Sequence, residues 1–328
     1  MITISSNKYK EMRKRGQVSF FIVIGVFLVV LVGFFIYLSS FAVEKKTKAE
    51  VITTQQMPTE IQEINNYVVG CLQKVTQDGL ELIGKRGGMI TKDEGGRYNP
   101  TKKGRDYVCV SGEEDYVCGS EGEMVNYAII NIVVGEFVNL QGVNILPKIK
   151  IGTGNIHENL RGYIQNALTD LTYNGCLDSD ELNNIFNPKG FDIVSGSSMI
   201  NIELDIADDS VKINLKNYPL IITNRRTGEE RKLGDFYVTE KIRLRKTHKF
   251  LEILIPKITN GEVNLADADG KTAPQLDIDD FSDFEITKVS QEEVIRGDLT
   301  FIDDIIEVRD KNVGGKPYLF RFARMGTI

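Results

Sequence analysis

The chain has 328 residues, of which 41% are hydrophobic, and this length allows one large or two modest domains beside a membrane segment. Its formal net charge is −6; the first sixteen residues hold five basic residues and one acid, which leaves −10 on the remainder. Such an acidic remainder argues against nucleic-acid binding, which requires a basic face. Four cysteines and two scattered histidines are too few for a zinc cluster.

Residues 18–38 form an uncharged apolar run, VSFFIVIGVFLVVLVGFFIYL. A helix of this length spans roughly 30 Å at about 1.5 Å per residue, the thickness of the hydrocarbon core of a bilayer. A cleaved secretory signal would have a shorter apolar region followed by small residues, whereas bulky residues close this run. We therefore expect a retained transmembrane helix over residues 17–40, embedded in the lipid bilayer.

The charges on either side of this run predict its orientation. The denser basic cluster lies before it and stays in the cytoplasm. We expect a cytoplasmic leader at residues 1–16, a polar stalk at residues 41–58, and the bulk of the chain outside the cell membrane.

The sequence RKRGQVS at residues 13–19 resembles the class III signal of archaeal type IV pilin-like proteins. The resemblance implies that a prepilin-type peptidase cuts between Gly16 and Gln17. In that family a Glu follows shortly after the cut and serves filament assembly, but Phe21 stands at that position here. This departure weakens the expectation of a filament more than that of processing. An ordinary basic flank before a membrane helix is the alternative interpretation.

The exterior part begins with an amphipathic helix predicted at residues 59–84, where apolar residues recur at helical spacing. Gly79 is a weak point in this helix, and Gly84 with Gly87 and Gly88 ends it. A second helix is predicted at residues 155–173, with Asn155 as its N-cap. A short helix is expected at residues 181–186.

The four cysteines predict a disulfide framework outside the cell, where such bonds persist. Tyr-Val-Cys occurs twice, at residues 107–109 and 116–118, around a turn-forming cluster, which is typical of a hairpin. In that hairpin Cys109 lies opposite Cys118, and facing residues are close to disulfide range. The remaining pair is Cys71 with Cys176. The alternative for Cys71 is a free thiol in the core.

The rest of the chain is predicted to be mostly β. We expect one strand within residues 124–140, although its length also permits a helix, and an antiparallel meander from residue 191 to residue 223. Residues 239–255 fit helix and strand equally. Further strands are predicted at residues 284–289, 299–302 and 318–323. The expected fold class is α+β, with an N-terminal transmembrane helix, an α+β exterior domain at residues 59–255 with an antiparallel sheet, and a β-rich C-terminal part at residues 256–328.

No catalytic or cofactor-binding motif is apparent, and we expect no enzyme activity. His157 and His248 lie outside any known catalytic spacing and are interpreted as solvated surface residues. Asp267 and Asp269 precede Gly270 as in a calcium loop, but the third oxygen ligand and the closing Glu are missing. We interpret this segment as a turn and expect no metal.

The anchor, the sequence YPL at residues 218–220 and the sequence GKPYLFRFA at residues 315–323 together resemble a group of uncharacterised, membrane-anchored extracytoplasmic proteins of small-genome archaea. The resemblance implies no activity. Two functions fit the sequence. One is a single-pass cell-surface protein whose exterior is structural or binds an unknown extracellular partner or another copy of itself. The other is a pilin-like filament subunit assembled through its N-terminal helix.

Overall fold

The computed structural model describes residues 59–99, 107–110, 123–134, 137–150, 155–169, 175–195, 200–264, 270–276, 278–296, 299–312 and 315–326. Residues Gln62 to Ile328 form one compact unit. The leader, the transmembrane helix and the stalk expected at residues 1–58 lie outside the described residues. Among the helices that are described, none is both long and apolar enough to cross a membrane.

The described α-helices are α2 (Thr59–Lys85), α3 (Ile156–Thr169), α4 (Ser179–Phe186) and α5 (Leu244–Thr259). Single turns of 3-10 helix occur at Lys92–Glu94, Asn187–Lys189, Ala273–Leu276 and Asp279–Phe281. The helices predicted at residues 59–84, 155–173 and 181–186 are confirmed, although the last four residues expected in the second one are not described.

Helix α2 buries the apolar face that the sequence predicted, including Ile64, Val68 and Leu72. It ends where Gly87 and Gly88 adopt positive φ angles of 70° and 94°, which glycine tolerates best.

The expected weak point of α2 does not interrupt it, because Gly79 lies where α3 crosses closely. A Cβ atom at Gly79 would lie 2.7 Å from Tyr163 Cδ1 and 2.8 Å from Leu160 Cδ1. The missing side chain therefore lets the two helices approach.

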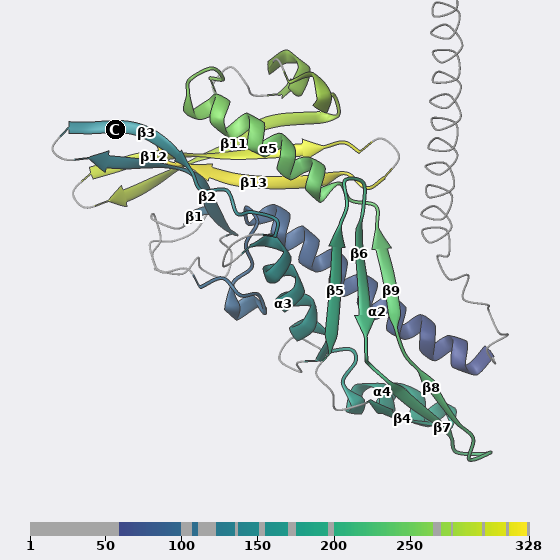
Figure 1. Ribbon diagram of the computed structural model, residues 1–328. Helices are drawn as coiled ribbons and strands as arrows, with labels where there is room; N and C mark the ends of the chain where they lie inside the picture. Colours follow the sequence, from purple (N-terminus) through teal and green to yellow (C-terminus); the bar gives the residue numbers. More distant parts are fainter. Residues whose placement is uncertain are drawn as a thin grey trace, which may run out of the picture. The chain divides into compact units, whose positions relative to one another are not determined.

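The largest sheet has seven strands in the order β1-β2-β13-β12-β11-β10, with β3 also paired to β2. Its strands are β1 (Tyr107–Val110), β2 (Glu123–Val134), β3 (Phe137–Asn144), β10 (Lys271–Thr272), β11 (Phe284–Arg296), β12 (Leu299–Asp310) and β13 (Tyr318–Arg324). All its pairings are antiparallel except that of β13 with β2, which is parallel. The sheet thus joins strands from both sides of the domain boundary expected after residue 255. Figure 1 shows α5 lying across it.

The remaining six strands form two three-stranded sheets, which are the two halves of one ribbon. They are β4 (Phe191–Ser195), β5 (Asn201–Ile206), β6 (Val211–Lys216), β7 (Leu220–Asn224), β8 (Glu230–Leu233) and β9 (Phe236–Glu240). One half pairs in the order β5-β6-β9 and the other in the order β4-β7-β8 (Figure 1). Two of the connections between the halves contain Asn217 and Asp235, both with positive φ.

Several details differ from the sequence prediction. The single strand expected at residues 124–140 is a pair of strands, β2 and β3, which pair antiparallel; the continuous apolar run gives no sign of a boundary between them. The meander is antiparallel as predicted, but its first strand, β4, pairs with β7 and not with its neighbour in sequence. Residues 239–255 contain the end of β9 and most of α5. The overall prediction of a mixed α+β fold with antiparallel sheets and a β-rich C-terminal part is confirmed.

Strand β12 also runs further than the predicted residues 299–302, through Asp303 and Asp304. Both carboxylates have partners: Asp303 accepts a hydrogen bond from Tyr127 Oη, and Asp304 lies 2.7 Å from Lys288 Nζ. These contacts keep the acids within a strand.

The close packing of α2 against β13 generates a stability prediction. A Cβ atom at Gly84 would overlap the backbone oxygen of Leu319, which cannot rotate away. Gly84→Ala should therefore lower the free energy of unfolding by about 1–3 kcal/mol, measured by urea denaturation.

The matched control is Gly70→Ala in the same helix. Gly70 is exposed, and nothing lies within 4 Å of an added Cβ atom. Its replacement should raise stability by about 0.5–1 kcal/mol. Equal effects of the two substitutions would contradict the packing described here.

Candidate functional site

Of the sequence-predicted site residues, the structure pairs Cys71 with Cys176. Cys71 lies on the buried face of α2, and Cys176 follows α3. Their Cα atoms are 6.3 Å apart and the two sulfurs form a disulfide. The bond connects positions separated by 105 residues. Because Cys71 forms this bond, the alternative of a free core thiol at position 71 is excluded.

The other predicted pair is described on one side only. Cys109 lies in β1, and the residue opposite it in β2 is Met124. Cys118 lies outside the described residues, and the bond between Cys109 and Cys118 stays a prediction. Gly16 and Gln17 of the processing motif, and Asp267 and Asp269 of the acidic turn, also lie outside them. Within the described part of the chain, no group of three or more metal-binding side chains converges.

The prediction of a solvated surface position is wrong for His248. Its side chain is only 4% exposed, and Nε2 donates a hydrogen bond to the Pro147 backbone oxygen at 2.7 Å. Burial lowers the pKa of His248, because the charged imidazolium loses hydration there. The error arises because the basic residues around His248 suggested a solvated face, whereas α5 turns this position into the core.

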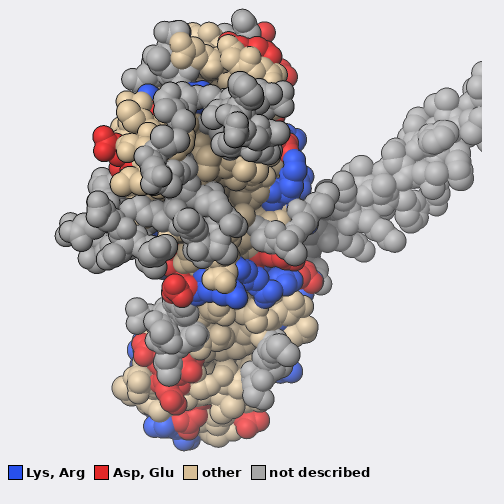
Figure 2. Space-filling view, turned by 90° about the vertical axis from the view of Figure 1, so that its left-hand side faces the viewer, with Lys and Arg blue, Asp and Glu red and all other residues tan. Residues whose placement is uncertain are grey.

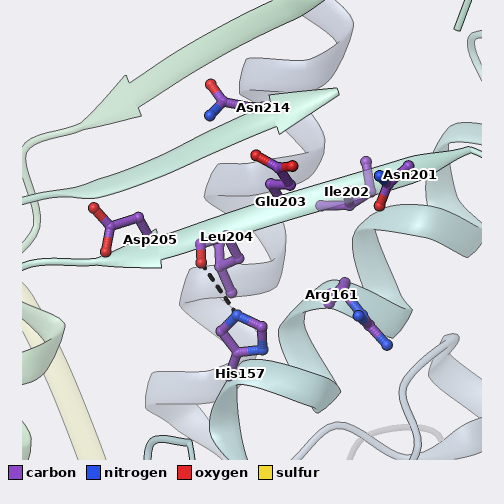
Figure 3. Close-up of a pocket in the computed structure, with 8 residues that line it drawn as sticks. All are labelled: His157, Arg161, Asn201, Ile202, Glu203, Leu204, Asp205 and Asn214. Atoms are coloured by element: carbon purple, nitrogen blue, oxygen red, sulfur yellow. Dashed lines mark hydrogen bonds between the residues drawn. The ribbon is translucent and has the colours of Figure 1, made fainter. Parts of the chain in front are cut away.

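His157 lines a hollow of about 420 Å³ between α3 and β5, which Figure 3 shows in close-up. The volume falls within the range of small ligand pockets. Two side chains come from α3, and the others come from β5 and its neighbour β6 (Figure 3). The lining residues are His157, Arg161, Asn201, Ile202, Glu203, Leu204, Asp205 and Asn214.

Helix α3 is held in place by its opposite side. Asn155 caps the helix, because its Oδ1 accepts a hydrogen bond from the backbone N–H of Glu158 at 2.8 Å. The buried Asn159 accepts hydrogen bonds from the backbone N–H groups of Ile90 and Arg97 through its Oδ1. These contacts present His157 and Arg161, which are one helical turn apart, to β5.

Strand β5 is the edge strand of its half-ribbon. At the turn after it, Ala207 N–H donates to the Ser210 oxygen at 2.9 Å, so Ala207 and Ser210 form a hydrogen-bonded pair. Going back along β5, the residue pairs between β5 and β6 alternate between non-hydrogen-bonded and hydrogen-bonded. The register makes Leu204 and Ile202 members of non-hydrogen-bonded pairs. Their backbone N–H and C=O groups therefore point away from β6 and toward α3.

His157 confirms this geometry, because its Nε2 lies 3.1 Å from the backbone oxygen of Leu204 (Figure 3). One outward group of the edge is thus bound to α3. For the Ile202 N–H and C=O groups and the Leu204 N–H, no partner is present among the described residues.

Arg161 is the other notable residue of the hollow. Its Nε is buried and has no hydrogen-bond partner. Its guanidinium forms no ion pair within the residues that the structure describes. Orphaned buried donors are uncommon, because each loses hydration without compensation. Sequence reasoning missed Arg161, although its spacing of four residues from His157 on a predicted helix placed the two on one face.

Charges of both signs surround the hollow. Glu203 on the outer face of β5 forms an ion pair with Lys216 at 2.7 Å, and Asp205 is exposed further along the strand. Figure 2 shows Lys and Arg side chains lying beside Asp and Glu side chains on one face of the molecule.

The buried acids elsewhere belong to the framework. Glu240 is 2% exposed and accepts hydrogen bonds from Gln73 and Gln77 of α2, each at 3.0 Å. Asp310 is fully buried and pairs with Arg243 at the start of α5. These carboxylates connect elements of the fold.

Comparisons with protein-family models, with curated proteins and with solved structures found no match for this chain. The hollow between α3 and β5 is therefore interpreted from its own geometry.

The disulfide yields a second stability prediction. A bond that closes a loop of this length stabilises by at most about 4–5 kcal/mol in the chain-entropy model, and about 2–4 kcal/mol is typical. A double replacement of Cys71 and Cys176 by serine should lower the free energy of unfolding by about 2–4 kcal/mol, measured by urea denaturation.

The control is the corresponding double replacement of Cys109 and Cys118, whose predicted loop is much shorter and should contribute less. A larger loss from the second pair than from the first would contradict the central role of the Cys71–Cys176 bond.

Proposed function

We propose that this chain is a single-pass, membrane-anchored cell-surface protein whose folded exterior binds a partner and carries no catalysis of its own. The main support is the disulfide between Cys71 and Cys176. Disulfides persist in oxidising compartments outside the cytoplasm. The basic residues before the apolar run at residues 18–38 independently favour the same side for this part of the chain.

The distribution of polar groups supports binding more than catalysis. The buried acids are engaged in hydrogen bonds and ion pairs between elements of the fold, as for Glu240 and Asp310. In contrast, Arg161 in the hollow has a buried donor that no described protein group accepts, which leaves it available to a ligand. The resemblance to anchored archaeal proteins agrees with this proposal and adds no activity to it.

The topology is tested with single cysteines at Ser5 and Arg226. Arg226 is exposed in the turn after β7, and the native cysteines of the described part are not free thiols. In intact cells a membrane-impermeant maleimide should label Arg226→Cys and leave Ser5→Cys unlabelled until the membrane is opened. Labelling of position 5 in intact cells would overturn the proposed orientation.

A pilin-like filament subunit is the second candidate, favoured by Gly16-Gln17 after the basic cluster and disfavoured by Phe21. Processing is common to both candidates and is tested separately. N-terminal sequencing of the mature protein should begin at Gln17, and Gly16→Leu should retain the leader. An intact Met1 in the wild-type protein would rule out cleavage. Electron microscopy of surface filaments, with mass spectrometry of their subunits, separates the two functions.

A further inference from the structure

Ile202 of β5 and Arg161 of α3 lie at the same end of the hollow, and neither the outward backbone groups of Ile202 nor Arg161 Nε has a protein partner among the described residues. An edge strand with free backbone groups accepts another extended chain by forming additional ladder hydrogen bonds. An arginine without an ion pair favours a carboxylate, which its planar guanidinium binds through two parallel hydrogen bonds. A single ligand type supplies both: an extended peptide with an acidic residue.

We propose that the hollow between α3 and β5 binds an extended peptide segment that pairs with the free backbone groups of Ile202 and places a carboxylate at Arg161. This inference names the class of partner for the exterior domain of the proposed function and rests on it for its biological setting. The binding site itself is argued from the geometry alone.

The His157 contact limits where the peptide can pair. The Leu204 carbonyl is the next outward acceptor along β5 after that of Ile202. Because His157 already binds it, a peptide N–H group cannot pair there. Pairing is therefore centred on Ile202, whose N–H and C=O both point outward. Figure 3 shows Arg161 at this end of the strand and Asp205 at the other.

The charge distribution selects the position of the carboxylate. Asp205 is exposed and repels an anion at its own end of the hollow. Glu203 is neutralised by Lys216 on the outer face. The carboxylate of the peptide is thus directed to Arg161, at the Ile202 end of the hollow.

The test uses the purified full-length chain and two pools of end-blocked hexapeptides. One pool carries a fixed Asp or Glu among randomised uncharged residues, and the other carries Asn or Gln at that position. The immobilised protein should retain the acidic pool about tenfold more strongly than the amide pool. Equal retention, or no retention of either pool, overturns the proposal.

Variants identify the residue responsible. Arg161→Gln should remove the preference for the acidic pool, whereas Arg161→Lys keeps the charge and should keep part of it. Arg226→Gln is the matched control, since it removes one positive charge from an exposed turn away from the hollow and should leave retention unchanged. Unchanged retention by Arg161→Gln, or an equal loss in Arg226→Gln, refutes a specific contact with Arg161.

Amide hydrogen exchange tests the strand pairing independently of charge. In the free protein the Ile202 and Leu204 amides should exchange faster than those of Glu203 and Asp205, which bond to β6. The acidic pool should slow exchange at Ile202. N-acetyl-aspartate amide is the comparison, because it carries the carboxylate without an extended backbone. If it binds as tightly as the peptides do, or if the Ile202 amide stays unprotected, the site binds small anions and the peptide proposal fails. The cysteine-labelling experiment tests only the membrane orientation, and the peptide experiments test only the binding site. A failure of the proposed function can therefore be distinguished from a failure of the peptide proposal.

Discussion

Helix α2 is the constraint on which the rest of the structure depends. Three later parts of the chain contact it at different levels. Helix α4 packs Phe186 against Tyr67, with ring centroids 5.6 Å apart, and the segment after α3 is bound through the disulfide at Cys71. In β13, Tyr318 Oη donates to the Leu80 oxygen at 3.1 Å. A helix of this length gains little stability by itself, and its order comes from burying its apolar face. Formation of α2 and docking of the later elements are therefore coupled.

Polar interactions between distant elements fix how the parts dock. Arg243 at the start of α5 binds Asp283 at 3.0 Å and also pairs with the buried Asp310 of β12. The hydrogen bonds raise the pKa of Arg243, so its charge is retained beside the two acids. Removing one member would leave the other buried without compensation, which costs more than the pair contributes. Such pairs select one arrangement of α5 over the sheet.

The sequence predicted elements better than partners. Helical spacing located α2, and Asn155 marked the start of α3, because both signals are local. Strand pairing depends on residues far apart, so the match of β4 with β7 and of β13 with β2 was not predictable from alternation alone. The hollow was missed for the same reason. Arg161 is ordinary in sequence, and it becomes distinctive only when the edge of β5 lies opposite and its Nε finds no partner.

The parallel pairing of β13 with β2 carries a consequence for biogenesis. Tyr127 of β2 lies beside Ala323 of β13, so the largest sheet joins a strand from the first half of the chain to one of the last segments to be synthesised. Contacts of such high sequence separation form slowly, and the strand that waits for its partner exposes backbone groups in the meantime. Because the chain is synthesised from its N-terminus, β2 is made well before β13. The largest sheet is therefore completed only when the last strands have been made, and before that point β2 is the strand most exposed to aggregation.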